Sequence, residues 1–357
     1  MIAPKGKISA PSPAAMKLSG QKYAERPPPP GRTVYTAVSM FCGCGGMDLG
    51  FVGGFRFKGS LYKRHPISIV RAYDNDRKSV ETYKLNLGKH AEIADLSGLS
   101  PKQMPGADIL VGGFPCQDFS ACGPNDGIEG KRGKLYKAMV DYMAEHQPLI
   151  AVGENVPHMT NMQGGKVWEV IKRDLEAAGY DCHLWKMHAA DYGVPQTRER
   201  LILMCVRKDL KGAPARPVAP HAKQHRSVCW AIDDLIALDG AHCPNHGQYF
   251  KANLAKNGHG QGDETNARDQ PAYTIRSNAK SRIQFHYELP RRLTIRECAR
   301  IQSFPDTFVF PQSATANVRQ IGNAVPPILA HTVAASVVEF LDARGEKPVT
   351  KRSNGGS

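Results

Sequence analysis

Residues 112–120, with the sequence GGFPCQDFS, hold a cysteine that could act as a nucleophile. An apolar run ends just before them, Pro115 restricts the backbone ahead of Cys116, and a polar, glycine-containing stretch follows up to Gly133. A thiolate at the end of a strand and under a loop is placed to attack an electrophilic carbon. The alternative is a small buried apolar side chain, which is what most free cysteines are.

Acidic and basic groups that could act beside Cys116 flank two later apolar runs. Glu154 follows the run at 149–153, so its carboxyl group can reach the same end of a sheet and handle a proton. Arg198 and Arg200 stand two residues apart on an extended segment, point the same way, and could clamp a phosphate or a carbonyl oxygen. The alternatives are a structural cap for Glu154 and an ordinary surface pair for the arginines.

A glycine-rich turn could bind a nucleoside-type cofactor. The sequence FCGCGG at 41–46 follows an apolar run, and its glycines let the backbone approach a ligand beside a helix amino terminus. Asp74, Asn75 and Asp95 follow the next two runs, where an acid commonly accepts hydrogen bonds from ribose hydroxyls. Helix N-caps are the alternative role for each carboxylate.

Short apolar runs alternate with helix-length segments and must position these residues. We expect strands at 34–40, 67–73, 108–112, 149–153, 184–187 and 201–206, and helices at 78–86, 134–145 and 167–178. The alternation predicts an α/β fold with a doubly wound, mostly parallel sheet and ligands at the carboxyl ends of its strands. Beyond Asp209 the alternation fails, which predicts a second, smaller domain. Helical patterns resume at 296–302 and 328–343.

The charge balance favours a polyanionic partner. The 357 residues carry a net charge of +14, and six Lys and Arg side chains lie in residues 1–33 against a single Glu. Residues 1–32 are rich in proline and alanine, which predicts a disordered arm that either contacts DNA or only aids solubility. No apolar run reaches membrane-span length and no secretory signal is present, so we expect a reducing cytoplasm and free thiols.

A zinc site is the competing interpretation of the second domain. The residues that could form it are His221, His225, Cys229, Cys243 and His246. Their gaps match no common zinc module, so we expect no metal.

Six motifs, in this order, resemble the cytosine-5 DNA methyltransferase family of the bacterial restriction-modification type. FCGCGG is similar to the motif that binds S-adenosyl-L-methionine (AdoMet), GGFPCQDFS to the nucleophile motif, and ENV (154–156) to the acid motif. QTRER (196–200) is similar to the arginine motif. LTIRECARIQSFPDTF (293–308) resembles the segment that supports the recognition region, and GNAVPP (322–327) the late motif that returns to the cofactor pocket. Each motif alone is weak, but six in register make chance agreement negligible.

The resemblance implies an AdoMet-dependent, Rossmann-like methyltransferase. Its cofactor site would be formed by Phe41, Gly43, Gly45, Asp74, Asn75, Asp95, Asn323 and Val325. Asp74 would hold the ribose and Asp95 would meet the adenine amino group. Asn75 departs from the family pattern, in which an aromatic residue often stacks on adenine.

The resemblance further implies that Cys116 adds to C6 of a cytosine flipped out of duplex DNA, which activates C5 for methylation. Glu154 would act near N3, and Arg200, with Arg198 behind it, would bind O2 and the adjacent phosphate. DNA contacts are expected from Gln117, Ser120, Arg132, Arg268, Arg276, Asn278, Lys280 and Arg282.

The expected organisation has five parts: a disordered basic, Pro-rich arm (1–32), a catalytic AdoMet-binding domain (33–208), a target-recognition domain (209–290), a return segment and C-terminal helix that complete the catalytic domain (291–343), and a flexible tail (344–357). We expect a sequence-specific DNA (cytosine-5)-methyltransferase that acts on double-stranded DNA as a cytoplasmic, nucleoid-associated monomer without a membrane partner. A cognate restriction endonuclease acting separately is compatible with this expectation. The alternatives are the same chemistry on RNA, a catalytically silent DNA-binding regulator and a structural AdoMet-binding protein.

Overall fold

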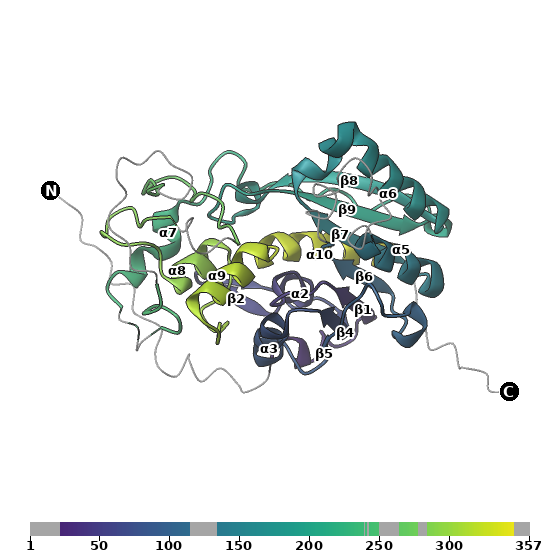
Figure 1. Cartoon of the computed structure of the whole chain (residues 1–357), viewed down its shortest axis with the longest axis horizontal. Coiled ribbons are helices and arrows are strands. Elements are labelled where there is room, and N and C mark those ends of the chain that lie inside the picture. Colours follow the sequence, from purple (N-terminus) through teal and green to yellow (C-terminus); the bar gives the residue numbers. More distant parts are fainter. Residues whose placement is uncertain are drawn as a thin grey trace.

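The computed structural model describes residues 22–114, 134–238, 240, 243–249, 264–277 and 284–345. A seven-stranded sheet in the order β5-β4-β1-β6-β7-β9-β8 forms its centre (Figure 1). The strands are β1 (Tyr35–Met40), β4 (Ile67–Asp74), β5 (Ala91–Ile93), β6 (Ile109–Gly112), β7 (Ile150–Asn155), β8 (Tyr180–His188) and β9 (Glu199–Arg207). Strand β9 is antiparallel to both of its neighbours, and the other pairs are parallel. The predicted doubly wound, mostly parallel sheet is therefore confirmed.

Helices cover both faces of this sheet, and others pack beside it. The helices of the described residues are α2 (Gly46–Val52), α3 (Arg77–Asn86), α5 (Lys134–His146), α6 (Lys166–Ala177), α7 (Val228–Ile232), α8 (Ile295–Ile301), α9 (Ala314–Asn323) and α10 (Pro327–Ala343). Successive strand residues point to opposite faces. Ala37 accordingly packs in one apolar cluster with α2 and α10, while Val38 packs in the other with α5 and α6. Both faces of β1 are thus buried, as a central parallel strand requires.

Several short elements have no counterpart among the expected strands and helices. They include the hairpin of β2 (Phe55–Phe57) and β3 (Ser60–Tyr62), the strand β5, the helices α2, α7 and α9, and the 3₁₀ segments η1 (Tyr23–Glu25), η2 (Pro101–Gln103), η3 (Pro157–Gly165), η4 (Ala189–Tyr192), η5 (Lys208–Leu210) and η6 (Asp233–Leu235). In the recognition segment, our name for residues 209–290, the described parts hold α7, η6 and isolated bridges such as Gln196 with Ala272. Figure 1 shows α7 and α8 at the opposite end of the molecule from α5 and α6.

The chain before β1 packs against the apolar core of the sheet. Tyr23 is 5% exposed, and its hydroxyl hydrogen bonds with Thr307. Ala24 N donates to Leu87 O at 3.0 Å, and Arg26 donates to Gly54 O at 2.8 Å. The prediction of a disordered arm is therefore wrong for residues 22–32, because one buried aromatic ring and its hydrogen bonds outweigh a composition poor in apolar side chains. Residues 1–21 lie outside the described residues.

The prediction of a flexible tail is wrong for its first residue, Arg344, and residues 346–357 lie outside the described residues. Arg344 donates from Nε to Leu210 O at 3.1 Å and from Nη2 to Lys211 O at 2.7 Å. Its guanidinium lies over the ring of Phe340, 3.5 Å from the centroid. A cation that caps the end of α10 and binds free carbonyls thus extends the folded region past residue 343.

Among the described residues, one helical stretch, Ala314–Ala343, passes a test of length and apolar composition for crossing a membrane. It comprises α9 and α10, and 72% of an apolar 18-residue stretch within it is buried inside the protein. Gly50 of α2 packs directly on Ala330 of α10, since a Cβ on this glycine would lie 2.4 Å from Ala330 Cβ. The stretch is therefore part of the core.

Candidate active site

An ion pair joins the ends of β7 and β9. Arg200 Nε lies 2.7 Å from Glu154 Oε1, and the two side chains are only 13% and 12% exposed. Arg200 Nη1 also donates to Glu199 O at 2.6 Å. The antiparallel register pairs Glu154 with Ile202 and so brings Arg200, on the same face two residues away, beside it. The structure thus brings together two of the predicted catalytic residues.

The chain leaving β6 lies against this pair. A Cβ on Gly113 would lie 3.2 Å from Glu154 Oε2, and Asn155 Nδ2 donates to Phe114 O at 3.1 Å. The Asn155 amide, buried at 6% exposure, therefore fixes the backbone two residues before Cys116. Asn155 was not predicted from the sequence, although an amide directly after Glu154 was the available signal. Cys116, Gln117, Ser120 and Arg132 lie outside the described residues.

Arg198 has different surroundings from Arg200. It is 1% exposed and donates to Ile275 O at 3.2 Å, Gly322 O at 2.9 Å and Ala324 O at 3.1 Å. Burial, with the nearby charge of Arg200, holds the pKa of its guanidinium well below the usual range. These bonds join the arginine motif to the late motif and to the recognition segment.

Two buried glutamines extend this connection, and neither was predicted from the sequence. Gln196 Nε2 donates to Gln302 Oε1 at 2.6 Å, and Gln196 Oε1 accepts from Ile275 N at 2.8 Å. Gln302 Nε2 donates to Ala324 O at 2.5 Å. Both side chains are fully buried, so their amides replace water as partners for backbone groups of three separate segments. Their place inside recognisable motifs was the signal that could have found them.

The glycine turn after β1 is held by Asp74. Gly43 N donates to Asp74 Oδ2 at 2.8 Å, and Asp76 N donates to Asp74 Oδ1 at 2.9 Å. Burial raises the pKa of the Asp74 carboxyl. Gly43 and Gly45 have φ of 54° and 94°, which favour glycine, and a Cβ on Gly45 would lie 2.7 Å from Leu87 Cδ1. A Cβ on Gly43 would meet no atom within 4 Å, so the turn is open on that side.

The other predicted cofactor residues follow β1 and its neighbouring strands or belong to the late motif. Because β1, β4 and β5 are parallel neighbours, half-exposed Phe41, exposed Asn75 and exposed Asp95 all follow the same edge of the sheet. Hydrogen bonds from Ser97 N and Oγ lower the pKa of Asp95. Val325 is buried, and its carbonyl oxygen would lie 2.5 Å from a Cβ on Gly46, so the late motif packs on the start of α2. Asn323 is exposed.

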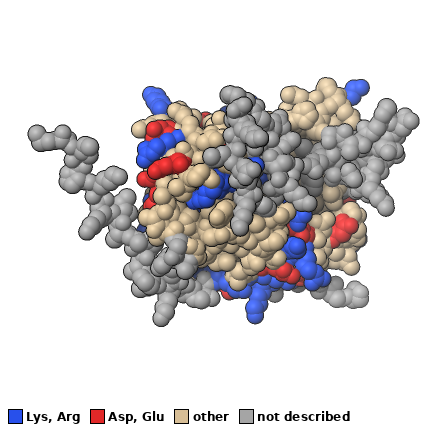
Figure 2. All heavy atoms as spheres, turned by 60° about the vertical axis from the view of Figure 1, so that its left-hand side comes forward, with Lys and Arg blue, Asp and Glu red and all other residues tan. Residues whose placement is uncertain are grey.

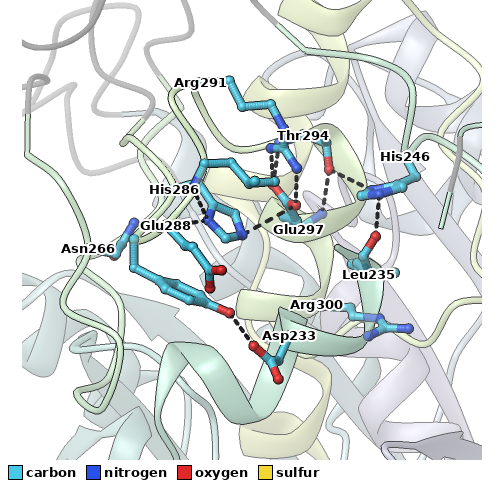
Figure 3. A network of polar contacts seen from close by, with 12 residues as sticks. Asp233, Leu235, His246, Asn266, His286, Glu288, Arg291, Thr294, Glu297 and Arg300 are labelled. Atoms are coloured by element: carbon cyan, nitrogen blue, oxygen red, sulfur yellow. Dashed lines mark hydrogen bonds and ion pairs between the residues drawn. The ribbon is translucent and has the colours of Figure 1, made fainter. Parts of the chain in front are cut away.

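A polar network ties the recognition segment to α8 (Figure 3). Arg291 donates to both oxygens of Glu297 at 2.8 Å, and Thr294 N donates to Glu297 Oε2 at 2.8 Å. Thr294 Oγ1 lies 3.2 Å from His246 Nδ1, and His246 Nε2 donates to Leu235 O at 2.8 Å. Although burial raises the pKa of Glu297, the Arg291 guanidinium more than offsets this and holds it below the usual range.

The predicted DNA-contacting residues that the structure describes are Arg268 and Arg276, and both are exposed. Arg268 lies 5.9 Å from the Tyr287 ring centroid and pairs with Asp233 at 3.5 Å. Asn278, Lys280 and Arg282 lie outside the described residues. In Figure 2, which turns the α7 end forward, the coloured surface shows Lys and Arg beside Asp and Glu in mixed groups.

Comparisons with known proteins agree with this arrangement. The family model of C-5 cytosine-specific DNA methylases matches residues 35–339. Type II methyltransferase M.BspRI of Lysinibacillus sphaericus is 32% identical over 86% of this chain and 82% of its own, and M.BsuRI of Bacillus subtilis is 31% identical over 85% and 79%. A putative DNA modification methyltransferase encoded within a prophage of E. coli has a TM-score of 0.67 at 21% identity, covering 86% of this chain and 99% of its own.

Proposed function

Because the chain belongs to the C-5 cytosine-specific DNA methylase family and is thus a DNA methyltransferase, we propose that it methylates C5 of a cytosine flipped out of double-stranded DNA. The reaction would proceed through a covalent bond between Cys116 and C6. One observation carries this proposal: the Glu154–Arg200 pair is directly beside the end of β6, from which the chain continues to Cys116.

The geometry of Glu154 supports a role at the base. Arg200 binds Oε1, whereas Oε2 faces Gly113, where a side chain would crowd it at 3.2 Å. A cytosine entering beside β6 could therefore place its N3 next to Oε2. The remaining donors of Arg200 could then hydrogen bond to its O2. Thiolate addition at C6 places electron density on C5 and N3, and a proton or hydrogen bond from Glu154 would stabilise it. Asn155 would act as a positioning residue because it holds the backbone beside this pair. Arg198 would act as one because it holds the late motif and the recognition segment to the start of β9.

The residues around the glycine turn fit AdoMet. Gly43 leaves open space, Asp74 retains lone pairs for ribose hydroxyls, and Val325 packs under the turn. When bound, AdoMet would supply the methyl group from its sulfonium. Asn75 would offer a hydrogen bond at the position where an aromatic ring would stack. We propose that Phe41, Gly45, Asp95 and Asn323 complete the site.

Sequence recognition would fall to the recognition segment. Arg268 and Arg276 are exposed cations there, and the buried network of Gln196, Gln302 and Arg198 links the segment to the catalytic strands. Arginine can bind guanine edges or phosphates. We propose that the protein acts as a cytoplasmic monomer bound to the nucleoid through DNA, within a Type II restriction-modification system whose endonuclease acts separately.

Covalent trapping tests this proposal. Bisulfite sequencing of plasmid DNA from cells expressing the protein identifies the methylated site, and a duplex with 5-fluorocytosine at that site is then incubated with protein and AdoMet. We expect a shifted band on a denaturing gel that requires AdoMet, because fluorine cannot leave as a cation. Cys116→Ala should abolish the band, whereas Cys122→Ala should keep it. Trapping that survives Cys116→Ala would refute Cys116 as the nucleophile, and methylation of RNA without methylation of DNA would refute the DNA substrate.

A further inference from the structure

Three side chains from two separate segments converge on one point beside η4. Asp191 Oδ1 lies 2.8 Å from His225 Nε2 and 3.3 Å from His188 Nδ1, and all three atoms lie within 4.8 Å of one another. We propose that His188, Asp191 and His225 form a divalent metal site, with Zn²⁺ as the ion that its donors fit. This site shares only His225 with the zinc ligands considered for the sequence.

The donor set and its spacing suit such an ion. Two imidazole nitrogens and a carboxylate oxygen are common zinc ligands, with bonds of about 2.0 to 2.2 Å that place tetrahedral ligand atoms about 3.4 Å apart. The separations of 2.8 and 3.3 Å from Asp191 Oδ1 need only a small outward movement to reach this spacing, and the two histidine nitrogens lie within 4.8 Å of each other. Three protein ligands leave a coordination position for water. The side chains of His188, Asp191 and His225 are 28%, 30% and 31% exposed, so an ion can reach them.

The backbone holds the three ligands in place before any ion binds. His188 ends β8, and Asp191 follows in the single turn η4. His221 N donates to Asp191 O at 2.9 Å, and Gln224 N donates to His221 O at 3.0 Å, which folds the loop so that His225 returns to Asp191. The ligands therefore pair a short His-x-x-Asp turn with one distant histidine. Preorganisation of this kind lowers the entropic cost of metal binding.

The position of the site indicates what an ion would do there. Ala189 N, next to His188, donates to Arg198 O at 2.7 Å, so η4 is bonded to the arginine motif. His225 belongs to the recognition segment, just before α7. A bound ion would tie the first part of that segment to the turn that supports the arginine motif, and we expect it to stabilise the folded protein without entering the reaction.

Metal titration of the full-length, tag-free protein tests this proposal. After treatment with a chelator, the wild type should bind one equivalent of Zn²⁺ with a rise in melting temperature, and Co²⁺ should give visible absorption bands. His188→Gln and His225→Gln should each weaken binding at least about 10-fold, because glutamine keeps a hydrogen-bond donor toward Asp191 but is a poor zinc ligand. Asp191→Ala should also weaken it. His221→Ala, on the same loop, is the matched control and should bind as the wild type does.

Each contrary result overturns the assignment. If the wild type binds neither ion at micromolar concentration, the three side chains form a hydrogen-bonded link and no metal site. Binding retained in both glutamine variants would place the ion on other ligands, such as cysteine thiols. Equal loss in His221→Ala would show that the three proposed ligands do not define the site. Circular dichroism of each variant checks that it is folded.

Discussion

Asp48 should make the stability of this protein fall as the pH rises. Its carboxylate is fully buried in the first turn of α2 and accepts hydrogen bonds from Ser39 Oγ and Tyr83 Oη, each at 2.7 Å. Burial raises the pKa of Asp48 to about 6, in spite of these two bonds. A group whose pKa is higher in the folded state binds its proton more tightly there. The stability that protonated Asp48 contributes is therefore fully present below the pKa of the unfolded state. It is lost as the pH rises through the pKa of the folded state.

The replacement Asp48→Asn should remove this pH dependence and keep the hydrogen bonds. The amide oxygen can accept from Ser39, and the amide nitrogen can donate to the Tyr83 hydroxyl. That hydroxyl lies 2.9 Å from His90 Nε2, and burial lowers the pKa of His90 to about 4, so the neutral ring can accept its proton. A shift of two pKa units corresponds to about 3 kcal/mol in total, of which about 1.4 kcal/mol is lost between pH 5 and pH 8.

Melting temperatures of both proteins at pH 5, 6, 7 and 8 measure the effect. From pH 5 to pH 8, the stability of the variant relative to the wild type should rise by about 1.4 kcal/mol. The difference between their melting temperatures should change by about 3 °C. Other titrating groups are common to both proteins and cancel in the difference. Asp181→Asn, at an exposed position in β8, is the control and should show no such change. Parallel curves for Asp48→Asn and the wild type would refute the reasoning.

Two further changes test how peripheral segments are held. Deleting residues 1–21 keeps Tyr23 and should leave the melting temperature unchanged, whereas deleting residues 1–32 should cost about 3 kcal/mol because a buried aromatic ring is lost. Calorimetry that gives both truncated proteins the same stability would contradict the packing of this segment. Glu297→Gln should lower the free energy of unfolding at pH 7 by about 2 kcal/mol, since Arg291 loses a charged partner. The pKa of Glu297 is lowered, so its contribution is present above the ordinary glutamate range and lost at acid pH. In urea unfolding, the difference in free energy of unfolding between the wild type and Glu297→Gln should therefore shrink as the solution is acidified. A difference that grows would contradict the stabilising role of the Glu297 charge.

The sequence predicted the sheet well because each buried strand is a short apolar run. The expected strand at 67–73 and helix at 78–86 differ from β4 and α3 by one residue at most. Strand β8 begins at Tyr180, four residues before the expected start, because Asp181 and His183 interrupt its apolar pattern while β9 still pairs with them. Backbone pairing with a neighbour can thus define a strand whose own side chains do not indicate one.

For the candidate active site, the sequence predicted the role of some residues and not of others. Glu154 and Arg200 could be identified because their residue types and their places at strand ends match a chemical role, and the structure pairs them at 2.7 Å. The identical residue type at Arg198 predicted the same role, yet its guanidinium binds three backbone carbonyls of the late motif and the recognition segment. Side-chain alternation on an extended segment shows which residues share a direction, but β9 begins only at Glu199, so Arg198 lies before the regular strand. Which atoms satisfy a buried arginine depends on segments more than seventy residues away, such as Ile275, and the spacing of residues within one motif carries no information about them.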